Sequence, residues 1–203
     1  MTTFGDNREL KVKLTFTDEV LGMMPADPEI HENYIASKAP DASTIEEEVA
    51  AVGVEEVVEK SRTVFPRDAE GKPFIWDYQV RGMFKDAIGM LRRISGSESA
   101  KLKNYKKVID GLVFVKERKI PISLSGEIGD CQRPLRAETA QGPRIALANS
   151  ETVPEGSSIE FTILLLDKGL EKVIRECLDY GALRGMCQWR NSGKGRFVWE
   201  EVK

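Results

Sequence analysis

The sequence predicts an α+β protein in which helices cover one face of an antiparallel sheet. Three observations carry this prediction. Residues 9–17 alternate apolar and polar side chains, residues 76–94 place apolar side chains at helical spacing, and the last third reads as strand, helix, loop and strand. With 203 residues the chain can bury a core as one domain. We therefore expect a single domain over residues 1–203, with insertions at 22–62 and 125–150.

The composition, with 41% hydrophobic and 31% charged residues, is that of a globular protein and excludes extensive disorder. No apolar run approaches a membrane span, and residues 1–8 lack the form of a secretory signal, so we expect a cytoplasmic protein with no membrane partner. The three cysteines form no Cys-x-x-Cys pair and His31 is the only histidine, which argues against a Cys and His zinc site. We predict no metal and no cofactor.

Charge is divided unevenly along the chain. Residues 1–60 carry 14 acidic and 5 basic side chains, a balance of -9, whereas residues 61–203 carry 19 acidic and 25 basic ones, a balance of +6. An acidic first part beside a basic remainder is the pattern expected for local anion binding on a net-acidic protein. A surface of mixed sign with no such role is the alternative.

The first half of the chain predicts one strand, an acidic insertion and one long helix. Residues 9–17 alternate as a half-buried strand does, and residues 21–40 read as an irregular connection. Residues 43–59 predict two short helices rich in glutamate, a composition more typical of a solvated helix face than of a metal site. The helix at 76–94 should bury the face that carries Val80, Phe84, Ala87, Ile88 and Leu91.

The second half predicts further strands and one more helix. Apolar runs and alternation indicate strands at 108–115, 119–124, 158–166 and 196–202, a β-hairpin formed by 132–137 and 144–148, and an amphipathic helix at 170–180.

The loop between the last helix and the last strand is the main candidate site. It contains four glycines and four cations, and no carboxylate. Glycine permits positive φ and close approach of another backbone, while arginine and lysine supply charge-assisted donors for phosphate. We expect a nucleic-acid-binding site that comprises Arg184, Gly185, Trp189, Arg190, Asn191, Lys194 and Arg196, with the Trp189 ring available for base stacking. A mobile basic connection that binds nothing is the alternative.

Other cations could extend this site. Arg81 and Lys85 lie off the buried face near the beginning of the long helix, and Arg133 and Arg136 lie on the predicted hairpin, where they could contact phosphates. Residues 101–107 add four lysines around Tyr105, the composition of a single-strand contact. Ordinary solvated side chains are the alternative for each.

The final third resembles a known family. Residues 151–161, with their Val-Pro-Glu-Gly turn before a strand, and the glycine-rich loop with Gly193, Gly195, Arg196 and Phe197 resemble the C-terminal part of the RAMP superfamily. These are ferredoxin-like or RRM-like proteins that include the RNA-binding backbone and processing subunits of CRISPR effector complexes. Residues 186–189 (Met-Cys-Gln-Trp) depart from the family's glycine-richer loop.

The resemblance implies a ferredoxin-like sheet and a non-catalytic protein that binds single-stranded nucleic acid, RNA in preference to DNA, as a repeating subunit of a CRISPR-like assembly. The alternative is a phage or mobile-element interaction protein of the same fold that binds a protein partner or self-associates.

Catalysis has weaker support. The processing nucleases of the family commonly use a histidine, and His31 matches no such motif, so we assign no catalytic residues. The carboxylates that could in principle hold a divalent cation show no clustered spacing; they are Asp68, Asp77, Asp86, Asp110, Glu127 and Asp130.

Overall fold

The protein is represented by a computed structural model that describes residues 7–26, 62–139 and 142–202. The predictions made for residues 43–59, for most of 21–40 and for His31 lie outside the described residues.

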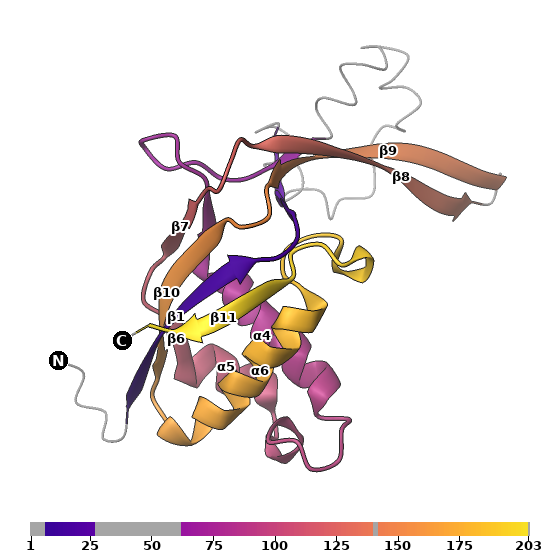
Figure 1. Ribbon diagram of the computed structural model, residues 1–203. Coiled ribbons are helices and arrows are strands. Elements are labelled where there is room, and N and C mark those ends of the chain that lie inside the picture. The colour runs from indigo at the N-terminus through magenta and orange to yellow at the C-terminus, as the bar shows by residue number, and fades with distance from the viewer. Residues whose placement is uncertain (1–6, 27–61, 140–141, 203) are drawn as a thin grey trace.

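The main sheet is antiparallel and contains both ends of the described chain (Figure 1). Its strand order is β11-β1-β10-β7-β5, with β6 paired to β10 beside β7. The strands are β1 (Arg8–Phe16), β5 (Phe74–Trp76), β6 (Val113–Val115), β7 (Lys119–Ser123), β10 (Ser158–Leu165) and β11 (Phe197–Glu201). The predicted strands at 9–17, 119–124, 158–166 and 196–202 are therefore confirmed to within a residue or two at each end.

Helices α4 (Asp77–Leu91), α5 (Tyr105–Leu112) and α6 (Glu171–Arg184) cover one face of this sheet (Figure 1). Taken along the chain, β1, α4, β6 with β7, β10, α6 and β11 give the βαββαβ arrangement in which the first and third strands pair at the centre. The predicted ferredoxin-like fold is confirmed.

The core lies between the sheet and these helices. On β1 the side chains that face the helices are all buried, and the register places Leu10 opposite Ile163 and Val12 opposite Phe161 on the neighbouring strand. From the helices, Phe84 and Ile174 complete the same apolar cluster with no exposed area. The alternation at 9–17 and the helical spacing at 76–94 therefore identified the two buried faces correctly.

A second sheet lies at the end of the first. Its strands are β2 (Val20–Leu21), β3 (Met24–Pro25), β4 (Thr63–Val64), β8 (Gly129–Thr139) and β9 (Gly142–Val153). The last two form the predicted hairpin, which is longer than its sequence signal and projects from the body of the protein (Figure 1). The assignment of 22–62 and 125–150 as insertions in one domain stays a prediction.

The strand predicted at 108–115 is wrong over most of its length. Residues 105–112 form α5, and only Val113–Val115 extend as β6. Val108, Ile109 and Leu112 lie at helical spacing and pack against the core. A short apolar run fits both a buried strand and a helix, so its periodicity alone could not decide between them.

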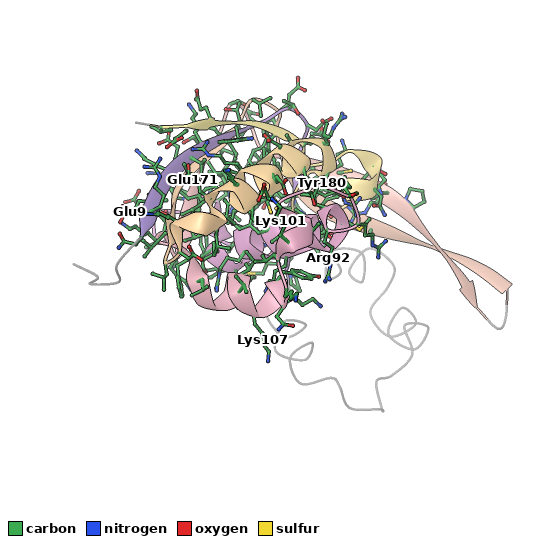
Figure 2. The ribbon with its side chains drawn as sticks, turned by 90° about the horizontal axis from the view of Figure 1, so that it is seen from below. Glu9, Arg92, Lys101, Lys107, Glu171 and Tyr180 are labelled. Atoms are coloured by element: carbon green, nitrogen blue, oxygen red, sulfur yellow. The ribbon has the colours of Figure 1, made fainter. Side chains whose placement is uncertain are left out.

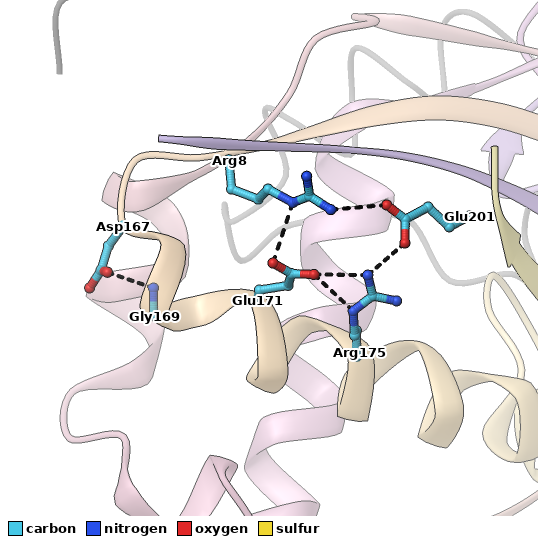
Figure 3. Close-up of polar contacts among 6 residues, drawn as sticks. All are labelled: Arg8, Asp167, Gly169, Glu171, Arg175 and Glu201. Carbon is cyan, nitrogen blue, oxygen red and sulfur yellow. Dashed lines mark hydrogen bonds and ion pairs between the residues drawn. The ribbon is translucent and has the colours of Figure 1, made fainter. Parts of the chain in front are cut away.

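A group of charged residues joins the outer ends of β1 and β11 to the beginning of α6 (Figure 3). Arg175 donates to Glu171 at 2.8 Å and to Glu201 at 2.6 Å, while Arg8 contacts the same two carboxylates at 3.3 and 3.1 Å. The hydrogen bond from Arg175, with the charges of Arg8 and Arg175, lowers the pKa of Glu171 against the opposing effect of burial. Because these side chains are partly exposed, each pair contributes at most about 1 kcal/mol.

Glu176 fixes the segment between α4 and α5 to α6. Its carboxylate accepts hydrogen bonds from the Glu98 and Ser99 backbone nitrogens at 2.7 and 3.0 Å and from the Ser99 hydroxyl at 2.9 Å. Burial opposes the charge, but these hydrogen bonds outweigh it and lower the pKa of Glu176. A lowered pKa adds stability above the ordinary carboxyl pKa, and this stability is lost as the pH falls.

We expect Glu176→Gln to lower the free energy of unfolding at pH 7 by about 1–2 kcal/mol, because hydrogen bonds to a charged acceptor are replaced by weaker ones. The difference from the unsubstituted protein should shrink as the pH falls below 4. Urea unfolding across this pH range measures it, with the exposed Glu200→Gln as the control. Equal losses in the two variants at every pH would contradict the assigned role.

Candidate nucleic-acid interface

The glycine-rich loop follows α6 and returns to β11, and it lies beneath the base of the long hairpin in Figure 1. Its two arms are closely packed. A Cβ at Gly185 would lie 2.3 Å from the Lys194 carbonyl oxygen, and one at Gly195 would lie 2.2 Å from that of Met186. Both glycines have positive φ, of 80° and 72°. These glycines are therefore required by the loop's own packing, which gives them a role that needs no ligand.

Backbone hydrogen bonds hold the closed loop against the end of β1. The Met186 nitrogen donates to Gly195 O at 3.0 Å, and the Gly195 nitrogen donates to Glu19 O at 2.8 Å. The Thr17 nitrogen donates to Arg196 O at 2.9 Å. Backbone hydrogen bonds thus join both arms of the loop to each other and to the turn after β1.

Each of the four loop cations meets a carboxylate from another part of the chain. The pairs are Arg184 and Arg190 with Asp86, Lys194 with Glu19, and Arg196 with Asp18, at 3.7, 2.7, 2.7 and 2.8 Å. The loop sequence itself has no carboxylate, but α4 and the turn after β1 supply three. The local charge is therefore close to neutral, and a phosphate would have to compete with these carboxylates for the loop cations.

The pairs still leave donors for a ligand. A guanidinium has five N–H donors, and Arg196 directs its Nε to Asp18 while its side chain remains 48% exposed. Partly exposed ion pairs contribute at most about 1 kcal/mol each, so replacing a carboxylate partner by a phosphate costs little free energy. Asn191 accepts a hydrogen bond from Arg184 within the loop.

Residues 186–189, the stretch that departs from the family pattern, attach the loop to the second sheet. The Gln188 amide nitrogen donates to Gly22 O at 2.7 Å, and its Oε1 accepts from Arg133 at 2.7 Å. The Arg133 guanidinium also lies 5.2 Å from the centre of the Trp189 ring. Arg133 is 7% exposed, so this predicted phosphate contact instead positions Gln188 and Trp189.

Arg81 and Lys85, two of the other predicted cations, pair with carboxylates outside the loop. Arg81 pairs with Asp77 at 3.2 Å, and Lys85 pairs with Asp110 at 2.8 Å. Arg136 lies on β8, and its side chain is outside the described residues.

An aromatic groove lies where β5 enters α4. The Trp76 and Tyr78 rings stack with centroids 6.2 Å apart and planes at 15°. The Arg118 guanidinium lies over both rings, 5.2 and 5.8 Å from their centres. Tyr78 is 50% exposed, and the hollow in front of these side chains has a volume of about 560 Å³. The aromatic groove is lined by Met23, Met24, Pro25, Pro66, Trp76, Tyr78, Gln79 and Arg118.

This groove continues to the glycine-rich loop. A second hollow of about 290 Å³ shares Met23, Tyr78 and Gln79 with the first, and Cys187 and Arg190 of the loop also line it. The groove therefore joins an exposed stack of rings to a loop arginine. Rings and cations in two adjoining hollows suit a flexible strand of bases and phosphates.

Sequence reasoning missed the aromatic groove. Trp76 and Tyr78 lie two residues apart at a strand-to-helix junction, and this spacing was the available signal. Arg118 lies 40 residues further along the chain, in the short basic run 116–119, and only the pairing of β5 with β7 brings it to the rings.

Among the residues that the structure describes, groups for nucleophilic or metal chemistry are not gathered at this interface. Burial raises the pKa of the Cys187 thiol to about 12, against the opposing charge of Arg190, and burial also raises the pKa of Cys177. Within the described residues, no group of three His, Cys, Asp or Glu side chains could hold a metal ion. The assignment as a non-catalytic protein stays a prediction.

No protein-family model and no curated protein sequence matches this chain. Within the described part, no helix is long and apolar enough to cross a membrane. Among solved structures, the chain is similar to one in a cryo-EM structure of the Type III-B Cmr-beta complex bound to cognate target RNA. The TM-score is 0.53 at 11% sequence identity, with 97% of this chain covered. This chain spans 59% of the length of that one. At this identity the similarity shows a shared fold and nothing finer.

Proposed function

We propose that this protein binds single-stranded nucleic acid, RNA in preference to DNA, without catalysing a reaction on it. The observation that carries the proposal is the exposed stack of Trp76, Tyr78 and Arg118 in a groove that leads to Arg190. Bases would stack on the rings. Phosphates would contact the donors of Arg118 that its ion pair with Asp77 leaves open, and the outer donors of the loop. The structural neighbour belongs to a complex bound to target RNA, which favours RNA as the polymer.

The glycine-rich loop takes a changed role in this proposal. Its cations are paired, so phosphates would contact only the donors that Asp86 and Asp18 leave open on Arg190, which lines the second hollow, and on Arg196, which is 48% exposed. Trp189 and Asn191 flank Arg190 in the chain. Repetition of the chain along a strand, as in a CRISPR-like assembly, extends the same proposal. Binding through this local surface is compatible with the formal net charge of -3, because the groove and the loop place their cations together on one part of the protein.

Tyr78→Ala tests the proposal. Loss of one stacked base should weaken binding to a labelled single-stranded RNA by about 1–3 kcal/mol, roughly 5- to 150-fold in Kd. Tyr78→Phe keeps the ring and should bind as the unsubstituted protein does. Fluorescence anisotropy at low salt measures the affinity, with Leu183→Ala as a control, because Leu183 is 79% exposed and lies outside the groove. Equal affinity of Tyr78→Ala and Tyr78→Phe would contradict this site.

A protein partner is the second candidate, and the paired loop cations favour it. A surface whose positive charges are already compensated, beside a projecting hairpin, suits a protein contact as well as a polyanion (Figure 1). Light scattering coupled to size-exclusion chromatography distinguishes the two. Association that depends on added RNA supports the first function, and association indifferent to RNA supports the second.

A further inference from the structure

A basic hollow lies between the end of α4 and the beginning of α5, on the helix side of the molecule. It has a volume of about 540 Å³ and is lined by Arg92, Lys103, Asn104, Tyr105, Lys106 and Lys107. Figure 2 looks onto this layer and shows Arg92 and Lys107 near its lower edge. The aromatic groove shares none of these residues.

The cations of the basic hollow differ from those of the glycine-rich loop in their partners. Among the described residues, none of its four cations forms an ion pair and no carboxylate lines the hollow. The nearby acids are already engaged: Glu98 pairs with Lys101 at 2.7 Å and Asp110 pairs with Lys85 at 2.8 Å. Among the residues that the structure describes, these four positive charges therefore have no paired carboxylate, so an anion meets less competition here than at the loop.

The walls of the basic hollow are held by the fold. The Arg92 guanidinium lies 5.5 Å from the centre of the Tyr105 ring, so the two side chains lie against each other. Gly89 allows this arrangement, because a Cβ there would lie 3.1 Å from the Tyr105 hydroxyl oxygen. Asn104 takes the left-handed conformation at φ 52°, and its side chain does not cap the helix. The three hydrogen bonds to Glu176 fix the preceding turn.

We propose that the basic hollow binds the phosphodiester backbone of a nucleic acid, as a second contact separate from the aromatic groove. Three lysines and an arginine supply the charge, the Asn104 amide supplies a neutral donor, and the Tyr105 ring faces the same space. This combination suits successive phosphates with a sugar or base between them. The identity of the polyanion rests on the proposed function, whereas the capacity to bind phosphate does not.

The test uses the variant Lys103→Ala/Lys106→Ala/Lys107→Ala and two probes, inorganic tripolyphosphate and single-stranded RNA. Alanine has the highest helix propensity, so α5 should persist. The control Lys11→Ala/Lys13→Ala/Lys172→Ala removes the same charge from elsewhere on the surface. Calorimetry at low salt should show tripolyphosphate binding that falls more than tenfold in the first variant and little in the control. For RNA, loss of three contacts should reduce the slope of log affinity against log salt by about 2.

The outcomes separate the two proposals. Equal tripolyphosphate affinity in both variants would overturn the basic hollow as a phosphate site, and so would the absence of binding in the unsubstituted protein. Neither result bears on the aromatic groove, which the Tyr78 variants test separately. Tripolyphosphate binding that RNA does not displace would overturn the assignment to a nucleic-acid backbone. Displacement by RNA, together with the smaller salt slope, supports it.

Discussion

Replacing Gly195 with alanine is expected to destabilise the protein by about 3 kcal/mol, the sum of a left-handed backbone cost and a steric one. The new Cβ would lie 2.2 Å from the Met186 carbonyl oxygen, and this oxygen belongs to the facing arm of the loop. The arms would have to separate. The hydrogen bond from Met186 N to Gly195 O and the one from Gly195 N to Glu19 O would then be lost or lengthened.

Gly71→Ala is the matched control for this change. Gly71 has φ of 79°, close to the 72° of Gly195, but a Cβ there would meet no atom within 4 Å. Gly71→Ala should therefore lower the free energy of unfolding by about 1 kcal/mol, from the backbone strain alone, with no steric clash. Urea unfolding of both variants measures the difference. Equal losses would mean that the loop arms are not packed as described, and would restore the interpretation of the glycines as space for a ligand.

Much of the fold could be predicted because its signals are local. The alternation of β1 and β10 and the spacing of α4 each identify a buried face within one segment, so the ferredoxin-like order follows from a few strong patterns. The strand prediction failed at 108–112, where the apolar run was too short for its period to distinguish a strand from a helix. The hairpin extends beyond its predicted ends at residues 129–131, which pair with 150–152 of β9. Residues of this part of β9 also pair with β2 and β4, and partners so distant in the sequence leave no local pattern.

The candidate site was harder to predict because its chemistry is assembled across the chain. The loop composition indicated an uncompensated basic segment, yet Asp18 lies 178 residues from its partner Arg196 and Asp86 lies 104 residues from Arg190. Ion pairs at such separations leave no trace in a local window. By contrast, Lys103, Lys106 and Lys107 lie in the segment that composition did single out, and the described acids beside them pair with other lysines.

Replacing Glu151 with alanine is the other large expected effect, a loss of about 3 kcal/mol in the free energy of unfolding. Glu151 opens the stretch that resembles the RAMP family, and its side chain is buried at the base of the hairpin with 5% exposure. Its carboxylate accepts from the Phe65 backbone nitrogen at 2.8 Å and pairs with Arg67. Alanine would leave the buried Phe65 N–H without an acceptor and Arg67 without its counter-charge.

The control is Glu155→Ala, which removes the same charge from an exposed turn four residues away and should change stability by no more than about 0.5 kcal/mol. A double-mutant cycle with Arg67→Ala separates the ion pair from the hydrogen bond to Phe65, because only the former vanishes when Arg67 is absent. If Glu151→Ala still lowers the free energy of unfolding in the Arg67→Ala background, the stability comes from the hydrogen bond between the Phe65 nitrogen and Glu151, which links the end of β4 to β9. If Glu151→Ala costs nothing in the Arg67→Ala background, the carboxylate stabilises the protein only through Arg67. The contact that links β4 to β9 would then be the one between the Thr63 and Ser150 hydroxyls, which are 2.8 Å apart.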